Sequence, residues 1–327
     1  MPARTTQTIE IEGKHLELSN LEKVLYPEAG FTKAQVIDYF VRIAPVLLPH
    51  LRGRPLTMKR YPEGVNGMHF YEKNCPKHRP KWVATAPVWS EGNNRWMDYC
   101  LLQDLPTLVW AANLADLELH TSLSMAKEIL RPTMMVFDLD PGPPADIRLC
   151  CQVALWLRPI FEKLKLESFP KTSGSKGLQV YVPLNTPTSY DETKPFAHEL
   201  ARILERQHPE SVVSDMKKTL RTGKVFVDWS QNDDHKTTIC VYSLRAKERP
   251  TVSTPVTWAE VEKCHKKQDA SLLVFTSDAT LKRADKSGDL FEPVLKLKQK
   301  LPPFKALNEF SGASTSAKPR VAARRRA

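Results

Sequence analysis

The chain has 327 residues, of which 41% are hydrophobic, enough for one large domain or two ordinary ones with a buried core. It has no apolar run near the roughly 18 residues of a membrane span, and its polar N-terminus lacks a secretory signal, so we expect a cytoplasmic protein with no membrane partner. The net charge is +11, of which residues 311–327 supply +5 and the rest of the chain +6. That excess favours a polyanionic partner, nucleic acid first, although solubility alone also accounts for it.

The cysteines show no paired spacing. Cys75 and His78 form only half of a zinc-binding pattern, so we do not expect a metal there. Scattered cysteines in a chain without a secretory signal predict reduced thiols and no disulfide framework. The set comprises Cys75, Cys100, Cys150, Cys151, Cys240 and Cys264.

The first fifty residues predict a hairpin followed by helices. Residues 1–18 alternate apolar and polar side chains, with the turn near Gly13. Ser19 and Asn20 look like a helix N-cap and predict a helix over residues 21–26. Thr32 predicts the start of a second helix, which Pro45 and Pro49 are expected to break.

Residues 55–96 predict irregular β-structure, with candidate strands at 58–61 and 69–74. Aromatic and basic side chains are mixed there, which suits stacking on bases and holding phosphates but suits an ordinary half-buried sheet equally well. Apolar residues then recur at helical spacing over residues 104–119, so we expect a helix there with His120 directly after it.

A short apolar run at the start of the stretch 134–142 predicts a buried strand that ends in Asp138 and Asp140. Because alternate residues of a strand share a face, the two carboxylates are expected to project together while Leu139 packs the other way. Two such close carboxylates repel each other unless a cation lies between them. Two solvated loop aspartates remain the simpler interpretation of this motif alone.

The second half of the chain alternates helices and strands, which predicts a mixed α/β fold. We expect helices at 146–164, 194–207 and 257–264, and strands at 178–182 and 224–229. Residues 237–244 are expected to pair with the strand at 224–229 as a hairpin. The basic segment 306–327 is expected to be disordered.

Asp228 ends its strand as Asp140 does, so a third carboxylate is expected to complete the site. Three such oxygen donors can hold two divalent ions, Mn²⁺ or Mg²⁺. One ion would activate a 3′-hydroxyl and the other would bind a triphosphate and its leaving pyrophosphate. The loop 173–177 contains Ser173, Gly174 and Lys176, which suit an anion site, although such a turn is also a common surface hairpin.

One protein family has three short sequence motifs in the same order as this chain, where they are residues 137–141, 172–178 and 227–232. With 18–27 and 242–245, they make residues 10–300 resemble the polymerase domain of bacterial DNA ligase D, in the archaeo-eukaryotic primase superfamily. The resemblance implies a catalytic β-platform flanked by helices, one primase-polymerase domain over residues 1–305, and a DNA-end-binding segment at about 10–50. It also implies DNA ends and gapped duplexes with a 5′-phosphate as partners, with nucleoside triphosphates as substrates. Further implied are the end-binding protein Ku, a fused or separate ligase, and a nucleoid-associated location.

The resemblance also assigns residues. It gives metal binding and catalysis to Asp138, Asp140 and Asp228. It gives nucleotide binding to His120, Ser173, Gly174, Lys176, Gln179, Gln231 and Arg245. It assigns binding of the DNA 5′-phosphate to Asn20, Lys23 and Lys33, and contact with the template or other DNA to Lys59, Phe70 and Tyr71.

Two features depart from the family pattern. Gln179 stands where the family commonly has histidine; it can still hydrogen-bond a phosphate but carries no positive charge, so weaker triphosphate affinity is expected. The residues outside 10–300 are too few for a ligase or nuclease domain, so we expect a stand-alone polymerase or an excised domain.

Two other functions remain open. A DNA-end-binding module with weakened catalysis is suggested by Gln179 alone, and the three intact acids argue against it. An aspartate-based phosphatase would use Asp138 as nucleophile and Asp140 as acid/base, but it leaves the glycine loop and Asp228 unexplained.

Overall fold

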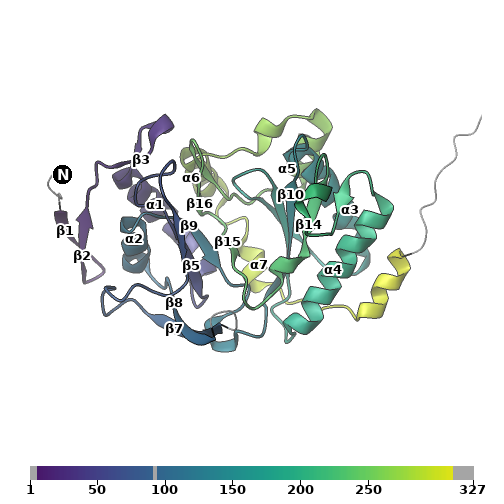
Figure 1. Ribbon diagram of the computed structural model, residues 1–327, viewed down its shortest axis with the longest axis horizontal. Helices are drawn as coiled ribbons and strands as arrows, with labels where there is room; N and C mark the ends of the chain where they lie inside the picture. The colour runs from purple at the N-terminus through teal and green to yellow at the C-terminus, as the bar shows by residue number, and fades with distance from the viewer. Residues whose placement is uncertain (1–5, 91–93, 312–327) are drawn as a thin grey trace, which may run out of the picture.

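The computed structural model describes residues 6–90 and 94–311, which adopt the mixed α/β fold expected from the sequence. Two large β-sheets lie beside each other, and helices cover each of them (Figure 1). Strands of both sheets contribute to one hydrophobic cluster between them, which includes Met58, Leu119, Val136 and Tyr181. In this part of the chain no helix is both long and apolar enough to cross a bilayer.

The first sheet is antiparallel and comes mainly from the N-terminal half of the chain. Helices α1 (Lys33–Leu51) and α2 (Leu105–Asn113) pack together beside it. Its strands, in spatial order, are β15 (Thr238–Ile239), β9 (Asp116–Thr121), β5 (Leu56–Arg60), β8 (Arg95–Cys100) and β7 (Thr85–Ser90), with β6 (Phe70–Glu72) also beside β5.

The second sheet carries acidic residues on an otherwise apolar strand. Along β10, Met135, Phe137 and Leu139 pack into a cluster with helices α3 (Ile147–Lys163) and α4 (Tyr190–Gln207). The opposite face of β10 therefore presents Asp138 and Asp140. The strands, in spatial order, are β11 (Phe169–Thr172), β12 (Leu178–Pro183), β10 (Met134–Pro141), β14 (Val225–Asp228) and β13 (Val212–Val213).

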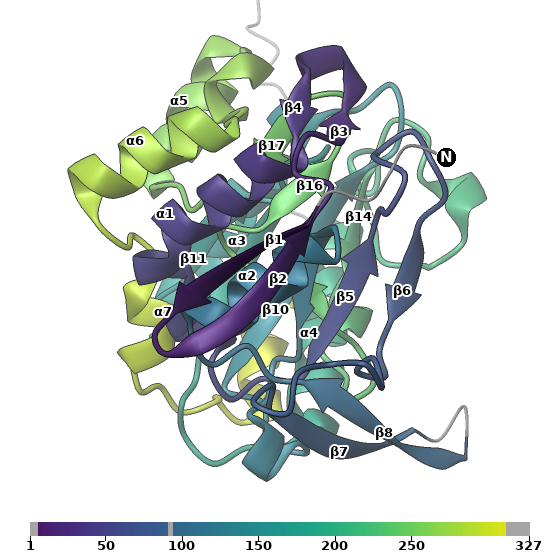
Figure 2. The same ribbon diagram turned by 90° about the vertical axis from the view of Figure 1, so that its left-hand side faces the viewer.

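Small ribbons and helices complete the fold. Figure 2 shows the ribbon of β1 (Thr6–Ile11) and β2 (Lys14–Ser19) in front of helix α2, which β2 contacts. The remaining elements are β3 (Val24–Tyr26) with β4 (Phe31–Thr32), β16 (Leu244–Ala246) with β17 (Pro250–Val252), α5 (Trp258–Lys267), α6 (Ser277–Ser287) and α7 (Glu292–Lys296).

The helix predicted at residues 21–26 is wrong. Asn20 has a φ of 52°, and the Lys23 amide donates to its carbonyl, so a turn stands where a helix was expected to begin. The chain then continues into β3, where Leu25 and Tyr26 are buried.

The helix predicted at 104–119 ends early. Ala115 has a φ of 57°, outside the right-handed helical region, and the chain then enters β9. The alternation of Asp116, Glu118 and His120 with Leu117 and Leu119 is the two-residue period of a strand, which the leucine spacing concealed.

The expected break of α1 at its prolines is also wrong, because both Pro45 and Pro49 lie inside the helix. Proline has no N–H, so Pro45 and Pro49 leave the carbonyls of Val41 and Pro45 without their helical partners. Val41 and Pro45 both lie on the exposed side of the helix. Water can therefore bond those carbonyls, while Phe40, Ile43 and other apolar residues of α1 stay packed.

Residues 237–244 are not the hairpin partner of β14. Within them β15 pairs with β9 of the first sheet, and Leu244 begins β16. The chain therefore leaves the second sheet after β14 and adds an edge strand to the first sheet, a long-range pairing that no local pattern signals.

The structure also differs from two predictions, one about the cysteines and one about the C-terminal segment. Cys75 and Cys100 form a disulfide, which corrects the prediction of reduced thiols for this pair. It ties the segment after β6 to the end of β8. The 3-10 helix η7 (Phe304–Phe310), whose Leu307 is buried, includes residues 306–310, so the prediction of disorder is wrong for these residues. Residues 312–327 lie outside the described chain.

Candidate functional site

Three predicted carboxylates converge at the open end of the second sheet. Asp138 of β10 is the register partner of Asp228 on β14, and Asp140 lies two residues further along the same face. Asp228 is held in place: Ser230 donates to its Oδ1 from the backbone (3.0 Å) and from the hydroxyl (2.6 Å), and Gln231 donates to its Oδ2 (2.7 Å).

The electrostatics of these acids favour a cation. Burial and the neighbouring Asp140 and Asp228 carboxylates raise the pKa of Asp138 to about 8. Burial and Asp228 likewise raise the pKa of Asp140. Asp138 Oδ1 is buried and has no hydrogen-bond partner among the described residues. Clustered carboxylate oxygens with one left unpaired fit Mn²⁺ or Mg²⁺, which prefer oxygen ligands.

The glycine loop is pressed against the end of β10. A Cβ on Gly177 would lie 2.2 Å from the Leu139 carbonyl oxygen, and one on Gly174, whose φ is +69°, would lie 2.6 Å from the Ser253 nitrogen. The Ser173 hydroxyl accepts hydrogen bonds from the backbone amides of Ser175 (3.2 Å) and Gly177 (3.1 Å). The loop is thus ordered with Ser173, Ser175 and Lys176 beside the acids.

Glu118, to which the sequence analysis gives no role, holds several cationic side chains on the side of the site opposite the three acids. Its carboxylate pairs with Arg245 Nε (3.2 Å), His120 Nε2 (3.3 Å) and Lys59 Nζ (3.4 Å). Burial opposes ionisation of Glu118, but these three groups together hold its pKa below the usual range. Burial lowers the pKa of His120, although Glu118 opposes that shift. A single acid within a strand carries no local sequence signal of its burial, so the sequence alone does not identify Glu118.

A cleft of about 510 Å³ lies between these two sides of the site. It gathers Asp138 and Asp140 with most of the predicted nucleotide-binding residues. The predicted residues among its lining are Asp138, Asp140, Ser173, Lys176, Gln179, Gln231, His120, Arg245 and Tyr71. The described lining also includes cations that were not assigned, Lys73 and Lys236.

The predicted 5′-phosphate residues lie apart from the cleft lining, around one turn. The amide of Lys33 donates to the carbonyl of Lys23, which places the two residues side by side. Lys23 Nζ pairs with Glu63 (2.8 Å) and is partly exposed. Lys33, however, is buried, and its Nζ donates to the Ser19 carbonyl (2.6 Å), so it supports the turn. Asn20 is exposed.

The predicted template residues form an exposed aromatic patch. Phe70 and Tyr71 are 38% and 60% exposed, and β6 places them opposite Arg60 and Lys59. Lys59 Nζ lies 5.2 Å from the Tyr71 ring centre. The ring of Tyr71 also contacts His120 edge-on, so the patch continues into the cleft.

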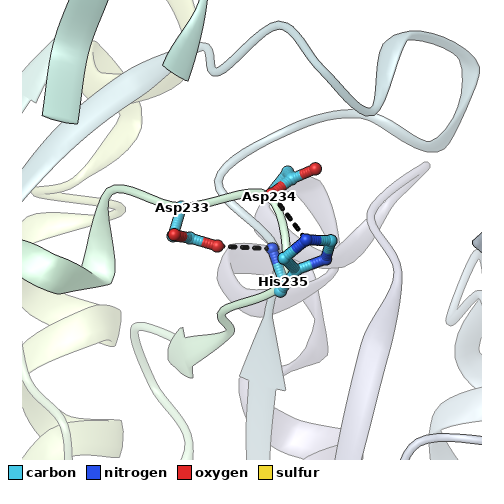
Figure 3. A group of neighbouring side chains, drawn as sticks. All are labelled: Asp233, Asp234 and His235. Atoms are coloured by element: carbon cyan, nitrogen blue, oxygen red, sulfur yellow. Dashed lines mark hydrogen bonds and ion pairs between the residues drawn. The ribbon is translucent and has the colours of Figure 1, made fainter. Parts of the chain in front are cut away.

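A second acidic cluster lies at the cleft rim. Figure 3 shows Asp233, Asp234 and His235, whose ligand atoms lie within 4.8 Å of one another. Asp233 already pairs with Lys194 (2.5 Å) and accepts a hydrogen bond from the His235 amide, while Asp234 lies 3.4 Å from the His235 ring. These bonds account for the cluster without a metal.

Comparisons with known proteins agree with this geometry. A family model described as "LigD, primase-polymerase domain" matches residues 32–291. The multifunctional non-homologous end joining protein LigD of Mycolicibacterium smegmatis is 40% identical over 283 residues, 86% of this chain and 36% of that protein. The bifunctional LigD of Bacillus subtilis is 31% identical over 274 residues, 84% of this chain and 43% of that protein. The chain thus spans about two fifths of the length of these relatives.

The fold matches a solved structure. The polymerase domain of Mycobacterium tuberculosis ligase D in complex with DNA superposes with a TM-score of 0.80 at 38% identity, covering 87% of this chain and 99% of that one. The primase-like β-platform expected from the sequence is therefore confirmed.

Proposed function

Because the chain belongs to the LigD primase-polymerase domain family, we propose that it is a template-dependent nucleotidyltransferase that adds nucleotides, ribonucleotides included, to DNA ends or gaps in non-homologous end joining. The observation that carries the proposal is the convergence of Asp138, Asp140 and Asp228 beside a cation-lined cleft. The solved relative bound to DNA supports DNA as the partner. Ku and a ligase are proposed from the family resemblance alone.

The chemistry assigned to this site is in-line phosphoryl transfer. The primer 3′-oxygen forms a bond to the α-phosphorus, the bond to pyrophosphate breaks, and the hydroxyl proton leaves to solvent. Two Mn²⁺ or Mg²⁺ ions held by Asp138, Asp140 and Asp228 would supply activation of the hydroxyl and neutralisation of the leaving group.

The protein's own residues position the reactants. Ser173 and Lys176 face the acids from the glycine loop and suit the triphosphate oxygens, with Arg245 and His120 held opposite by Glu118. The bonds of Ser230 and Gln231 fix the Asp228 carboxylate before any ligand arrives. Charges that are already in position lower the activation barrier, because the protein does not have to reorganise during the reaction.

Primer extension tests the proposal. A gapped duplex with a 5′-phosphate, a labelled nucleoside triphosphate and Mn²⁺ should give templated addition by the wild type and only background addition by Asp138→Asn. Asp269→Asn, an equal change on the surface, is the matched control and should keep wild-type activity. A wild type that binds the gapped duplex without extending it, under varied metal and nucleotide, would favour the end-binding module that Gln179 suggests.

A further inference from the structure

One row of polar side chains crosses four strands of the second sheet. Lys171 on β11 is the register partner of Gln179 on β12, which is the partner of Asp138 on β10, which faces Asp228 on β14. Side chains in register on neighbouring strands share a face and touch. Lys171 is therefore linked to the carboxylates through Gln179.

Lys171 is fully buried, which is an unfavourable place for a lysine. Its relative exposure is 0%, and that of Gln179 is 2%. Desolvation favours the neutral amine, so burial lowers the pKa of Lys171 to about 7, although Asp138 opposes that shift. An apolar side chain of similar length would fill the space at less cost, so packing alone does not explain a lysine here.

The contacts of Lys171 fix the orientation of one amide. Lys171 Nζ donates to Gln179 Oε1 (2.5 Å) and to Ser253 Oγ (2.6 Å). Ser253 in turn donates to the Thr172 carbonyl (2.9 Å), which holds this acceptor in place. While Lys171 is protonated, its ammonium can only donate, so the amide oxygen of Gln179 must point to Lys171 and its NH₂ group must point away, as the structure has them.

The direction of that NH₂ group matters for the site. Gln179 lines the cleft, and its amide favours the ionised form of Asp138. With the amide turned over, its oxygen would face the Asp138 carboxylate and any phosphate in the cleft, and both contacts would repel. The Gln179 amide therefore acts as a donor toward the site only while another group, here Lys171 Nζ, donates a hydrogen bond to its oxygen.

We propose that Lys171 is a positioning residue, which locks the Gln179 amide as a hydrogen-bond donor toward Asp138 and toward the phosphates of the bound nucleotide. The inference rests on the proposed nucleotidyl transfer and names a residue that acts through Gln179 without touching the nucleotide.

A double-mutant cycle separates this role from general support of the fold. Lys171→Met alone should raise the KM for the nucleotide about tenfold, the loss expected for one hydrogen bond to a charged group, with a smaller change in kcat. In a Gln179→Leu background the same change should alter KM less than about twofold, because no amide remains to be held. Equal effects of Lys171→Met in both backgrounds would overturn the proposal.

Equilibrium binding of ATP, measured by calorimetry, provides a second readout that does not need turnover. It should show the same non-additive pattern. If the wild type binds ATP but extends no primer, the proposed function fails while the cycle still tests Lys171. If the wild type extends primers and the cycle is additive, only the Lys171 inference fails.

Two further variants guard against a folding defect. Gln179→Glu keeps an acceptor for Lys171 but has no NH₂ group, so it should stay folded and still bind ATP at least tenfold more weakly. Wild-type affinity in Gln179→Glu would refute the donor role. Arg283→Met breaks the half-buried ion pair (2.7 Å) between Arg283 of α6 and Glu260 of α5, outside the described cleft lining. It should lower the melting temperature without changing the nucleotide KM.

Discussion

Glu118 Oε1 lies 3.2 Å from Arg245 Nε, and the same buried carboxylate meets His120 at 3.3 Å and Lys59 at 3.4 Å. One side chain on β9 thus holds a residue from β16, a residue from β5 and its own neighbour. The three held groups are ones that the family resemblance assigns to nucleotide or DNA. A single acid therefore sets the geometry of one wall of the cleft.

Replacing Glu118 with glutamine should damage nucleotide binding more than catalysis. The amide keeps the shape but removes the charge that fixes Arg245 and His120. We expect the nucleotide KM to rise about tenfold or more and the free energy of unfolding to fall by about 1–3 kcal/mol. Steady-state gap filling and denaturant unfolding measure the two effects. Glu262→Gln, which removes an exposed partner of Arg158, is the matched control; an unchanged KM in Glu118→Gln would contradict the role.

The stability of the metal-free protein should fall as the pH rises from about 4 to 8. The unfolded pKa of an aspartate is about 3.9. Burial and the neighbouring carboxylates raise the folded pKa of Asp138 to about 8. Between these values the folded state binds more protons than the unfolded state, so raising the pH favours unfolding.

Melting temperatures measured in a chelator across that range check the sign. Asp138→Asn removes the titrating group and its repulsion, so the variant should show a flatter profile and a higher melting temperature than the wild type at pH 8. A wild type that becomes more stable between pH 5 and 8, relative to Asp138→Asn, would rule out this account.

Divalent ions should reverse that instability by binding the same acids. A ligand that binds only the folded state raises the melting temperature with concentration. We expect Mn²⁺ to raise it for the wild type near pH 8 and to have little effect on Asp140→Asn. Asp234→Asn, in the rim cluster that Figure 3 shows, should keep the full response. Loss of the response in Asp234→Asn alone would place the ion at the rim.

Sequence reasoning reached the acids because their signals are local. Asp138 and Asp140 end a short apolar run before Pro141, and Asp228 ends another strand, so both strands and their shared face follow from neighbouring residues. The pairing of β10 with β14 gives the contact that the pattern could only suggest.

The residues that sequence reasoning missed depend on distant partners. Glu118 and Lys171 are charged residues inside strands, and nothing beside them in the chain announces burial. Glu118 is paired with Arg245, and Lys171 with Ser253, both far along the chain. The sequence also conceals β9, because Leu117 and Leu119 continue the helical spacing of α2 beyond Ala115, the residue with positive φ at which the chain leaves the helical conformation. Such contacts become visible only once the sheets are assembled.

The Lys23–Glu63 pair leads to a prediction about DNA ends. Lys23 Nζ lies 2.8 Å from Glu63 at a partly exposed site, and such surface pairs contribute little to stability. If Lys23 holds the 5′-phosphate of a gapped duplex, then Lys23→Ala should weaken binding about tenfold when that phosphate is present and have little effect when a 5′-hydroxyl replaces it.

Glu63→Ala is the matched variant, because it releases Lys23 from its partner. It should bind the phosphorylated duplex as tightly as the wild type or slightly more tightly, since the competing carboxylate is gone. Fluorescence anisotropy with the two duplexes and three proteins gives the comparison. Equal losses of Lys23→Ala on phosphate and hydroxyl ends would show that the lysine contributes only general positive charge, and the 5′-phosphate site would then have to lie elsewhere.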